Sequence, residues 1–139
     1  MIVADASVWV SLLVPDDVHH ATSRQWLGEH LTRGEPIVAP VLLLAEVAAA
    51  VARRTGRSSD GEQALAFVLR VPSMRLVTVD GRLGQTAARL AAQCQVRGAD
   101  AIYVATAQHL KIPLVTWDRQ QRERAASVVA TRAPDPATS

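Results

Sequence analysis

Residues 2–14 read IVADASVWVSLLV, a short apolar strand and an apolar helix with a single aspartate, Asp5, between them. The run at residues 2–4 has the length of a strand buried on both faces, and residues 6–14 continue as a helix. An ionised carboxylate inside an apolar run costs several kcal/mol unless a partner or a pKa shift neutralises it. Asp5 therefore needs an explanation.

The same alternation of short apolar strands and helices continues along the chain. It predicts an α/β fold, a three-layer α/β/α sandwich with a central, mostly parallel sheet of about five strands. We expect one domain over residues 1–132 and a disordered polar tail over residues 133–139. The other predicted strands are residues 36–39, 75–78, 111–116 and 127–131, and the other predicted helices are residues 19–31, 41–54, 58–71, 80–93 and 98–110.

Two further acids lie where this fold would bring them close to Asp5. Asp118 follows the predicted strand 111–116, and Asp100 lies in the first turn of the predicted helix 98–110. In open parallel sheets, ligands bind outside the carboxyl ends of the strands. We therefore expect all three carboxylates on one rim of the sheet.

A fourth acid, Glu46, lies inside the predicted helix 41–54. The stretch VLLLAEVAAAVA is apolar all round apart from Glu46, so it predicts a largely buried helix without a local partner for the charge. Four carboxylates on one rim would repel one another without a cation. The pattern predicts a metal site.

Each acid also has a purely structural explanation. Asp5 and Asp118 both stand where a helix N-cap belongs. Asp100, in the first turn of a helix, would favour the helix dipole. Glu46 could pair with Arg53 or with an arginine from elsewhere in the chain. The sequence leaves these alternatives open.

The charge balance is compatible with a polyanionic substrate. The chain has 139 residues with 15 Lys and Arg against 13 Asp and Glu, a net charge of +2, and Lys111 is its only lysine. If a metal takes up four acids, 15 basic groups face the 9 acids that remain of 13. Arginine forks bind phosphate in a bidentate manner. A plain compositional preference for arginine is an equal alternative.

The same composition bears on the cellular compartment. The single cysteine, Cys94, excludes an intramolecular disulfide and favours a reducing, cytoplasmic environment. The apolar N-terminus contains Asp5 and lacks a basic leader, so it predicts neither a signal peptide nor a membrane span.

Four segments resemble the four acidic motifs of PIN domains, in particular those of VapC-type toxins of toxin–antitoxin pairs. The resemblance covers residues 2–131, in the family's order and at its usual size. Such domains are metal-dependent ribonucleases. The segments are IVADASVWVSLLVPDD (2–17), APVLLLAEVAAAVARR (39–54), RGADAIYVATAQHL (97–110) and IPLVTWDRQ (112–120).

The resemblance implies a role for each matching residue. Thr116 matches the hydroxyl of the family's T-x-D motif, and Ser7 matches the small hydroxyl residue after the first acid; both would support the site. The segment after the fourth acid lacks the family's usual aromatic, and Trp117 is a candidate substitute. The residues that would be both catalytic and metal-binding are Asp5, Glu46, Asp100 and Asp118.

The chemistry of these residues agrees with that activity. Carboxylate oxygens suit Mg²⁺ or Mn²⁺, and no cysteine or histidine stands at the four positions. A metal-activated water that attacks a phosphodiester would leave a 5′-phosphate and a 3′-hydroxyl. By resemblance, the substrate is RNA, with tRNA and rRNA as candidates. The expected partners are a small cognate antitoxin and a second copy of the chain, and no membrane.

Apolar residues beyond the predicted core favour such partners. Residues 41–52, together with Trp9, Leu12 and Leu13, supply more apolar surface than a small sheet can cover, which indicates a homodimer interface, an antitoxin groove or both.

Two other classes of function remain open. A phosphatase of the haloacid dehalogenase type also uses an aspartate after the first strand, but it needs a second aspartate two residues later, where this chain has Ser7. A non-catalytic binding module would use the acids to hold arginines of a protein or of an RNA-associated partner.

Overall fold

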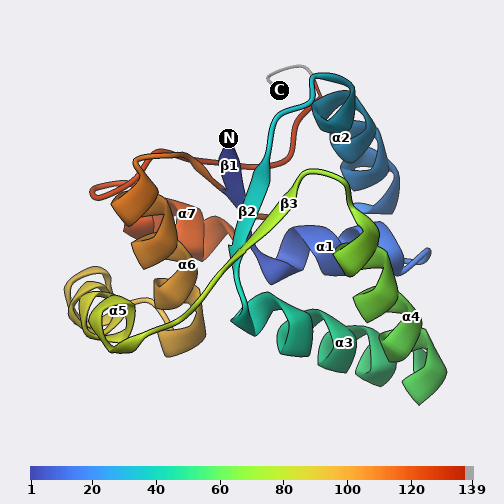
Figure 1. Ribbon diagram of the computed structural model, residues 1–139, viewed down its shortest axis with the longest axis horizontal. Coiled ribbons are helices and arrows are strands. Elements are labelled where there is room, and N and C mark those ends of the chain that lie inside the picture. The colour runs from blue at the N-terminus through green and yellow to red at the C-terminus, as the bar shows by residue number, and fades with distance from the viewer. Residues whose placement is uncertain (137–139) are drawn as a thin grey trace.

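The computed structural model describes residues 1–136 as an α/β sandwich (Figure 1). Its strands are β1 (Ile2–Ala4), β2 (Ile37–Pro40), β3 (Met74–Val77), β4 (Leu114–Val115) and β5 (Thr131–Arg132). Its helices are α1 (Ala6–Leu13), α2 (His20–Thr32), α3 (Leu42–Thr55), α4 (Ser58–Arg70), α5 (Gly81–Cys94), α6 (Gly98–Leu110) and α7 (Arg119–Ala125).

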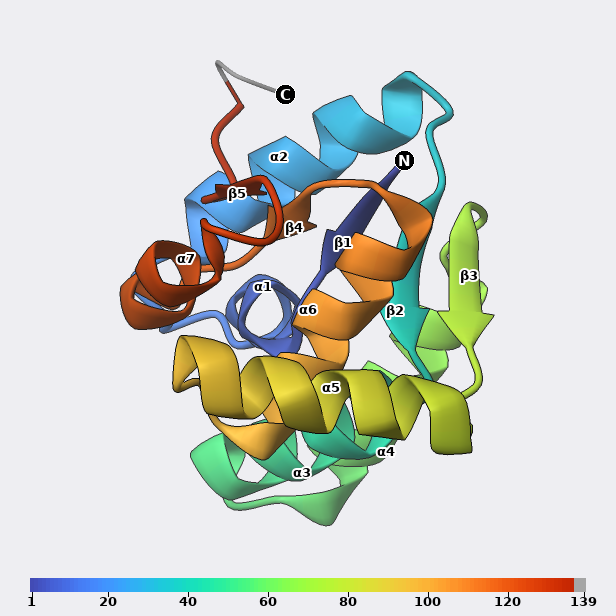
Figure 2. The same ribbon diagram turned by 90° about the vertical axis from the view of Figure 1, so that its left-hand side faces the viewer.

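The five strands form one parallel sheet in the order β3-β2-β1-β4-β5. Helices α1 to α4 lie on one side of the sheet, and α5 to α7 lie on the other (Figures 1 and 2). The predicted three-layer α/β/α fold is therefore confirmed, and the sheet is parallel throughout the described residues.

The burial of the strands explains their continuous apolar sequences. Every residue of β1, β2 and β4 is buried, because helices cover both faces of the middle of the sheet. Strand β3 lies at the edge, and its two middle residues, Arg75 and Leu76, are exposed. The core of the fold thus centres on β1 and its two neighbours.

The strand order creates a switch point beside β1. The chain leaves β1 towards β2 and β3 on one side, and later returns to β4 and β5 on the other. Neighbouring parallel strands whose connections run in opposite directions open a crevice at their carboxyl ends, where ligands of such folds bind. Here that crevice lies between the ends of β1 and β4.

The final strand was predicted wrongly. Residues 127–131 were expected to be extended, but the amides of Val128 and Val129 donate to the carbonyl of Ala125, so the chain turns there. Strand β5 begins only at Thr131. Apolar residues that close the end of a short helix have the same local composition as a weak strand.

Two predictions of apolar surface also need correction. Helix α3 is not largely buried: Ala45 and Ala49 are exposed, and only one stripe of larger side chains points into the core. Trp9 is 1% exposed and Leu12 4% exposed, because α1 packs against α2 and α3 within the same chain. Most of the apolar surface expected for a partner is thus covered by the protein's own helices.

The C-terminal segment follows β5 without regular structure over residues 133–136, where Pro134 is buried. The rest of the predicted tail, residues 137–139, lies outside the described residues. None of the described helices combines the length and the apolar character that crossing a membrane requires.

Candidate active site

Asp5 lies at the switch point, directly after β1. Its backbone amide donates to the carbonyl of Val115 in β4 at 3.1 Å, which ties it to the neighbouring strand. Its side chain caps α1, because Oδ1 accepts from the amide of Ser7 at 3.0 Å and from the Ser7 hydroxyl at 2.5 Å. The residue is only 4% exposed. The carboxylate is therefore buried, but polar groups of the chain surround it.

Thr116 holds the second oxygen of this carboxylate. Its hydroxyl donates to Asp5 Oδ2 at 2.8 Å and accepts from the amide of Asp118 at 3.0 Å. The Oε1 atom of Gln121 lies 3.0 Å from the same hydroxyl. A threonine has one hydroxyl hydrogen, so the shorter contact to the carboxylate is the one we assign to it. Ser7 and Thr116 thus both support Asp5 by direct hydrogen bonds.

The electrostatics of Asp5 are unfavourable. Burial, and to a smaller extent the charge of Asp100, raise the pKa of Asp5, while the hydrogen bonds from Ser7 and Thr116 lower it; the net change is from 3.8 to about 6. At neutral pH the carboxylate is ionised but poorly solvated. A nearby cation would relieve this cost.

Glu46 reaches the site from α3 and is held by a tyrosine of α6. The hydroxyl of Tyr103 donates to Glu46 Oε1 at 2.6 Å, and Tyr103 is 1% exposed. Burial and the carboxylate of Glu46 raise the pKa of Tyr103, so the phenol remains a donor. The described residues show no ion pair between Glu46 and an arginine, and this tyrosine is the partner that the sequence left open.

Asp100 and Asp118 are joined by one arginine. The Nε atom of Arg97 lies 3.1 Å from Asp100 Oδ2, and its Nη2 lies 3.8 Å from Asp118 Oδ2. The two carboxylates, with a contribution from Glu46, raise the pKa of Arg97. The carboxylates of Asp100 and Asp118 thus share the positive charge of one guanidinium group.

The capping explanation is correct for Asp118 as well as for Asp5. Oδ1 of Asp118 accepts from the amide of Gln121 at 3.1 Å and begins α7. Asp100 stands in the first turn of α6, as the dipole explanation requires. These local roles do not exclude a functional one, since the cap of Asp118 uses Oδ1 and leaves Oδ2 directed to Arg97.

Two supporting residues were missed from the sequence. Gln121 is 2% exposed; its Oε1 lies 3.0 Å from the Thr116 hydroxyl, and its Nε2 donates over a long distance, 3.5 Å, to the carbonyl of Asp100. Tyr103 stands three residues after Asp100, so both share one face of α6. That spacing was a usable signal for Tyr103, whereas nothing in RQQRER distinguishes Gln121.

The loop after β4 is fixed by Trp117. Its amide donates to the Ser7 hydroxyl at 3.0 Å, and its indole Nε1 donates to Ser23 at 2.8 Å. The ring stacks on His19 with centroids 3.7 Å apart. Trp117 therefore anchors the loop that carries Thr116 and Asp118.

The donor set fits a hard divalent cation, although it is not assembled as a cage. All four acids offer oxygen ligands. Asp5 uses about three of its four lone-pair positions, and one on Oδ2 stays open. Within residues 1–136, no group of three or more acidic, histidine or cysteine side chains is arranged as a ready metal site. Arg97 now supplies the positive charge at Asp100 and Asp118.

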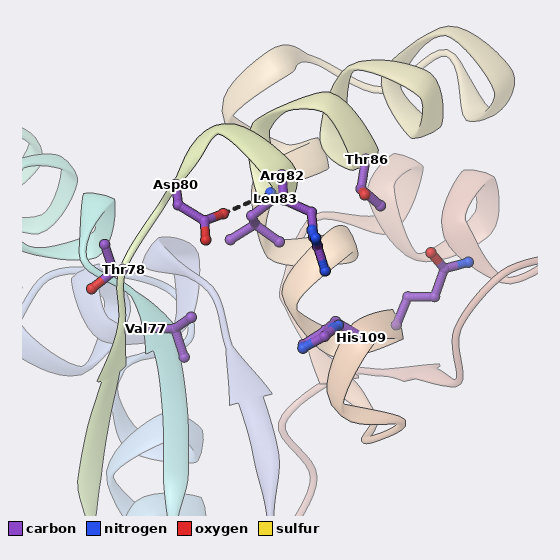
Figure 3. Close-up of a pocket in the computed structure, with 8 residues that line it drawn as sticks. Val77, Thr78, Asp80, Arg82, Leu83, Thr86 and His109 are labelled. Carbon is purple, nitrogen blue, oxygen red and sulfur yellow. Dashed lines mark hydrogen bonds between the residues drawn. The ribbon is translucent and has the colours of Figure 1, made fainter.

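A small hollow lies beside the acids, and two of the four line it. The hollow beside them has a volume of about 30 Å³, and Arg97, Asp100 and Asp118 line it. A hollow of about 280 Å³ lies elsewhere, between the end of β3 and helices α5 and α6 (Figure 3). Its lining includes Asp80, Arg82 and His109 but none of the four acids. A small molecule thus finds no deep pocket at the candidate site.

A parallel sheet with a buried aspartate at its switch point and further acids on one rim defines an α/β protein with a ligand site outside the strand ends. The chain belongs to the PIN domain family, whose model matches residues 2–127. The comparison with curated protein sequences gave no match.

Solved structures share this fold. VapC20 of Mycobacterium tuberculosis, described as a sarcin–ricin loop cleaving toxin, superimposes with a TM-score of 0.74 at 20% identity, over 94% of this chain and 97% of that one. FitAcB of Neisseria gonorrhoeae gives 0.73 at 19% identity, over 96% and 98%. VapBC2 of Rickettsia felis, bound to a DNA fragment from its promoter, gives 0.73 at 16% identity, over 97% and 100%. At these identities the likeness establishes the fold.

Proposed function

We propose that the protein is a metal-dependent endoribonuclease, the toxin of a type II toxin–antitoxin pair. The observation that carries the proposal is Asp5, a carboxylate buried at the switch point of a PIN domain and destabilised by the charge of Asp100. Burial raises the pKa of this carboxylate, and three hydrogen-bond donors still hold it in place. Such a perturbed and fixed carboxylate is suited to bind a cation.

Mg²⁺ or Mn²⁺ would be held by oxygens of Asp5, Glu46, Asp100 and Asp118. When bound, such an ion lowers the pKa of a coordinated water and neutralises charge at the leaving 3′-oxygen. Ser7 and Thr116 orient the carboxylate of Asp5, and Tyr103 orients that of Glu46. Hydrolysis by water would give a 5′-phosphate and a 3′-hydroxyl.

An RNA strand fits this surface better than a small metabolite. The hollow lined by Asp100 and Asp118 has a volume of only about 30 Å³, so the substrate must be bound by contacts outside it. Structured RNA is the first substrate class to test, with tRNA and rRNA as candidates, since VapC20 is described as cleaving the sarcin–ricin loop.

A small antitoxin and a second copy of the chain are the proposed partners, with the cytoplasm as the compartment. One neighbour, from Klebsiella pneumoniae, was solved as a toxin–antitoxin complex. An apolar hollow of about 180 Å³ between α1, α2 and α4 would accept an apolar segment of an antitoxin, and Leu12, Leu27, Leu31 and Phe67 line it. Leu13, expected at an interface, belongs to the same hollow.

The alternative is a non-catalytic binding module. The bridge from Arg97 to Asp100 and Asp118 favours it, because it demonstrates that these acids accept an arginine. The phosphatase has less support, since Ser7 donates to Asp5 where that mechanism needs a second acid.

The deciding experiment is RNA cleavage by purified, partner-free protein. The substrates are tRNA and rRNA fragments with Mg²⁺ or Mn²⁺, and the variants are Asp5→Asn and Asp80→Asn. Asp80 also caps a helix, through a 2.9 Å bond from the amide of Leu83, but it lies outside the four acids. We expect cleavage by the wild type and Asp80→Asn only, and none in EDTA. Sequencing RNA ends after induction in cells would then locate the target.

Equal RNA loss in the wild type and in Asp5→Asn would refute the ribonuclease. Metal-dependent binding of RNA without cleavage would favour the binding module. Hydrolysis of p-nitrophenyl phosphate through Asp5, with RNA left intact, would favour the phosphatase.

A further inference from the structure

Arg97 occupies an unusual place among the four acids. It stands at the N-cap position of α6 with extended backbone, so its side chain turns back over the first turn of that helix. The guanidinium then reaches Asp100 on its own helix and Asp118 on the loop after β4. One arginine therefore bridges two of the carboxylates that the proposed metal would need.

The bridge is asymmetric in its exposure. The side chain of Arg97 is 82% exposed, whereas that of Asp100 is 16% exposed and that of Asp118 is 34% exposed. An exposed guanidinium keeps most of its hydration and gains little from an ion pair, so it can leave at low cost. Asp118 is fixed by its capping bond, and the partly buried Asp100 stands within a helix. Arg97 is therefore the member of this group that can move away at the lowest cost.

A metal ion and this guanidinium compete for the same atoms. Both contacts of Arg97 are made to Oδ2 oxygens, at 3.1 and 3.8 Å, so an ion bound to the same oxygens would lie close to the guanidinium charge. A divalent cation also carries twice the charge and would repel Arg97 from the rim.

We propose that Arg97 is a substrate-binding residue that exchanges partners. In the metal-free protein its guanidinium occupies the cation's place on Asp100 and Asp118. When the metal is bound, it turns to a phosphate of the RNA beside the scissile bond. This inference rests on the proposed nuclease function and adds a residue to that site.

The surroundings of Arg97 favour phosphate as its second partner. The hollow that it lines is also lined by Arg124, whose guanidinium is anchored on the carbonyl of Gln95. With Asp100 and Asp118 neutralised by a metal, the remaining charges around this hollow are positive. Arginine is suited to the exchange, because its planar fork matches both carboxylate and phosphate oxygens.

The first test measures metal binding without RNA. Calorimetry with MnCl₂ on the full chain, after treatment with EDTA and buffer exchange, compares the wild type, Arg97→Gln and Arg89→Gln. Arg89 is an exposed arginine of α5 without an ion pair among the described residues, and it controls for general charge. Arg97→Gln removes ion pairs with the strength of ordinary surface salt bridges, and it should therefore tighten Mn²⁺ binding about 3- to 10-fold. Arg89→Gln should change it less than about 2-fold.

The second test measures RNA binding by fluorescence anisotropy with a labelled RNA hairpin. All proteins keep Asp5, and Mn²⁺ is added to the level that saturates each of them by calorimetry. The anisotropy is read at 4 °C before cleavage proceeds, and a gel of the same samples checks that the RNA is intact. Arg97→Gln should weaken binding about 5- to 10-fold with Mn²⁺ and lower the salt slope by about one, as expected for one lost phosphate contact. In EDTA its effect should be less than about 2-fold, because Arg97 is then held by Asp100 and Asp118.

Two results would overturn the exchange. One is a Mn²⁺ affinity in Arg97→Gln that is equal to or weaker than that of the wild type. The other is a loss of RNA affinity in Arg97→Gln that is the same with Mn²⁺ and with EDTA, since this would mean that Arg97 attracts RNA by its charge whether or not the metal is bound. A wild type that binds Mn²⁺ and cuts no RNA would refute the nuclease instead, and the calorimetric comparison of Arg97→Gln would remain decisive for the first half of the exchange.

Discussion

Replacing Asp5 by asparagine should stabilise the metal-free protein. The pKa of Asp5 rises from 3.8 to about 6 in the folded state, mainly through burial. A rise of roughly two units, at about 1.4 kcal/mol per unit, means that ionised Asp5 opposes folding by about 3 kcal/mol. Because the folded pKa is raised, the contribution of Asp5 to the free energy of unfolding is most favourable below about pH 4 and is lost as the pH rises through 6.

Asparagine keeps the contacts that aspartate makes. Its carbonyl can accept from Ser7, and its amide can donate to the hydroxyl of Thr116, which then donates to Gln121. Asparagine also caps helices as well as aspartate does, and only the helix-dipole benefit of the charge, about 0.3–1 kcal/mol, is lost. The expected net gain in the free energy of unfolding is about 2 kcal/mol at pH 7.5.

Urea denaturation in EDTA, repeated between pH 4 and pH 8, measures this gain. The advantage of Asp5→Asn over the wild type should vanish near pH 4 and reach its full value above pH 7. Saturating Mn²⁺ should stabilise the wild type and reduce the difference, because the ion binds the folded state. A variant that is destabilised equally at both ends of the pH range would refute the electrostatic explanation, and packing of the carboxylate would then dominate.

Three further substitutions test the supporting contacts and the packing, all by urea denaturation. Tyr103→Phe removes the hydroxyl that donates to Glu46 at 2.6 Å and should cost about 1–2 kcal/mol; an unchanged stability would show that water replaces it. Thr116→Val leaves a buried carboxylate without its donor and should cost about 1–3 kcal/mol, whereas Thr116→Ser should keep most of the stability; equal losses would point to packing. Gly61→Ala would place its Cβ 2.5 Å from a carbonyl oxygen of α3 and should destabilise by about 1–3 kcal/mol, although alanine favours helices. Its control is Gly84→Ala, whose Cβ meets nothing within 4 Å and should stabilise by about 0.5–1 kcal/mol; similar values for both would contradict the crowding between α3 and α4.

Local sequence was a good guide where local forces decide. The alternation of apolar strands and helices determined the fold class, since hydrophobic periodicity and helix breakers act over a few neighbouring residues. It failed at residues 127–131, where a helix-ending turn looked like a strand. It also overestimated the burial of α3, because alanines such as Ala45 can lie on a surface at little cost.

The sequence by itself determined which acids and hydroxyls stand at the ends of strands, and thereby Asp5, Thr116 and the membership of a nuclease-like fold. Only the tertiary structure decided what these groups touch. Thr116 reaches Asp5 across 111 positions of the chain, and Tyr103 reaches Glu46 across 57. Arg97 meets Asp118 only because the N-terminus of α6 and the loop after β4 lie on the same rim. Such contacts depend on how the helices pack against the sheet, and the pKa of Asp5 depends on the burial that this packing produces. The spacing of neighbouring residues in the sequence determines neither the packing nor the burial.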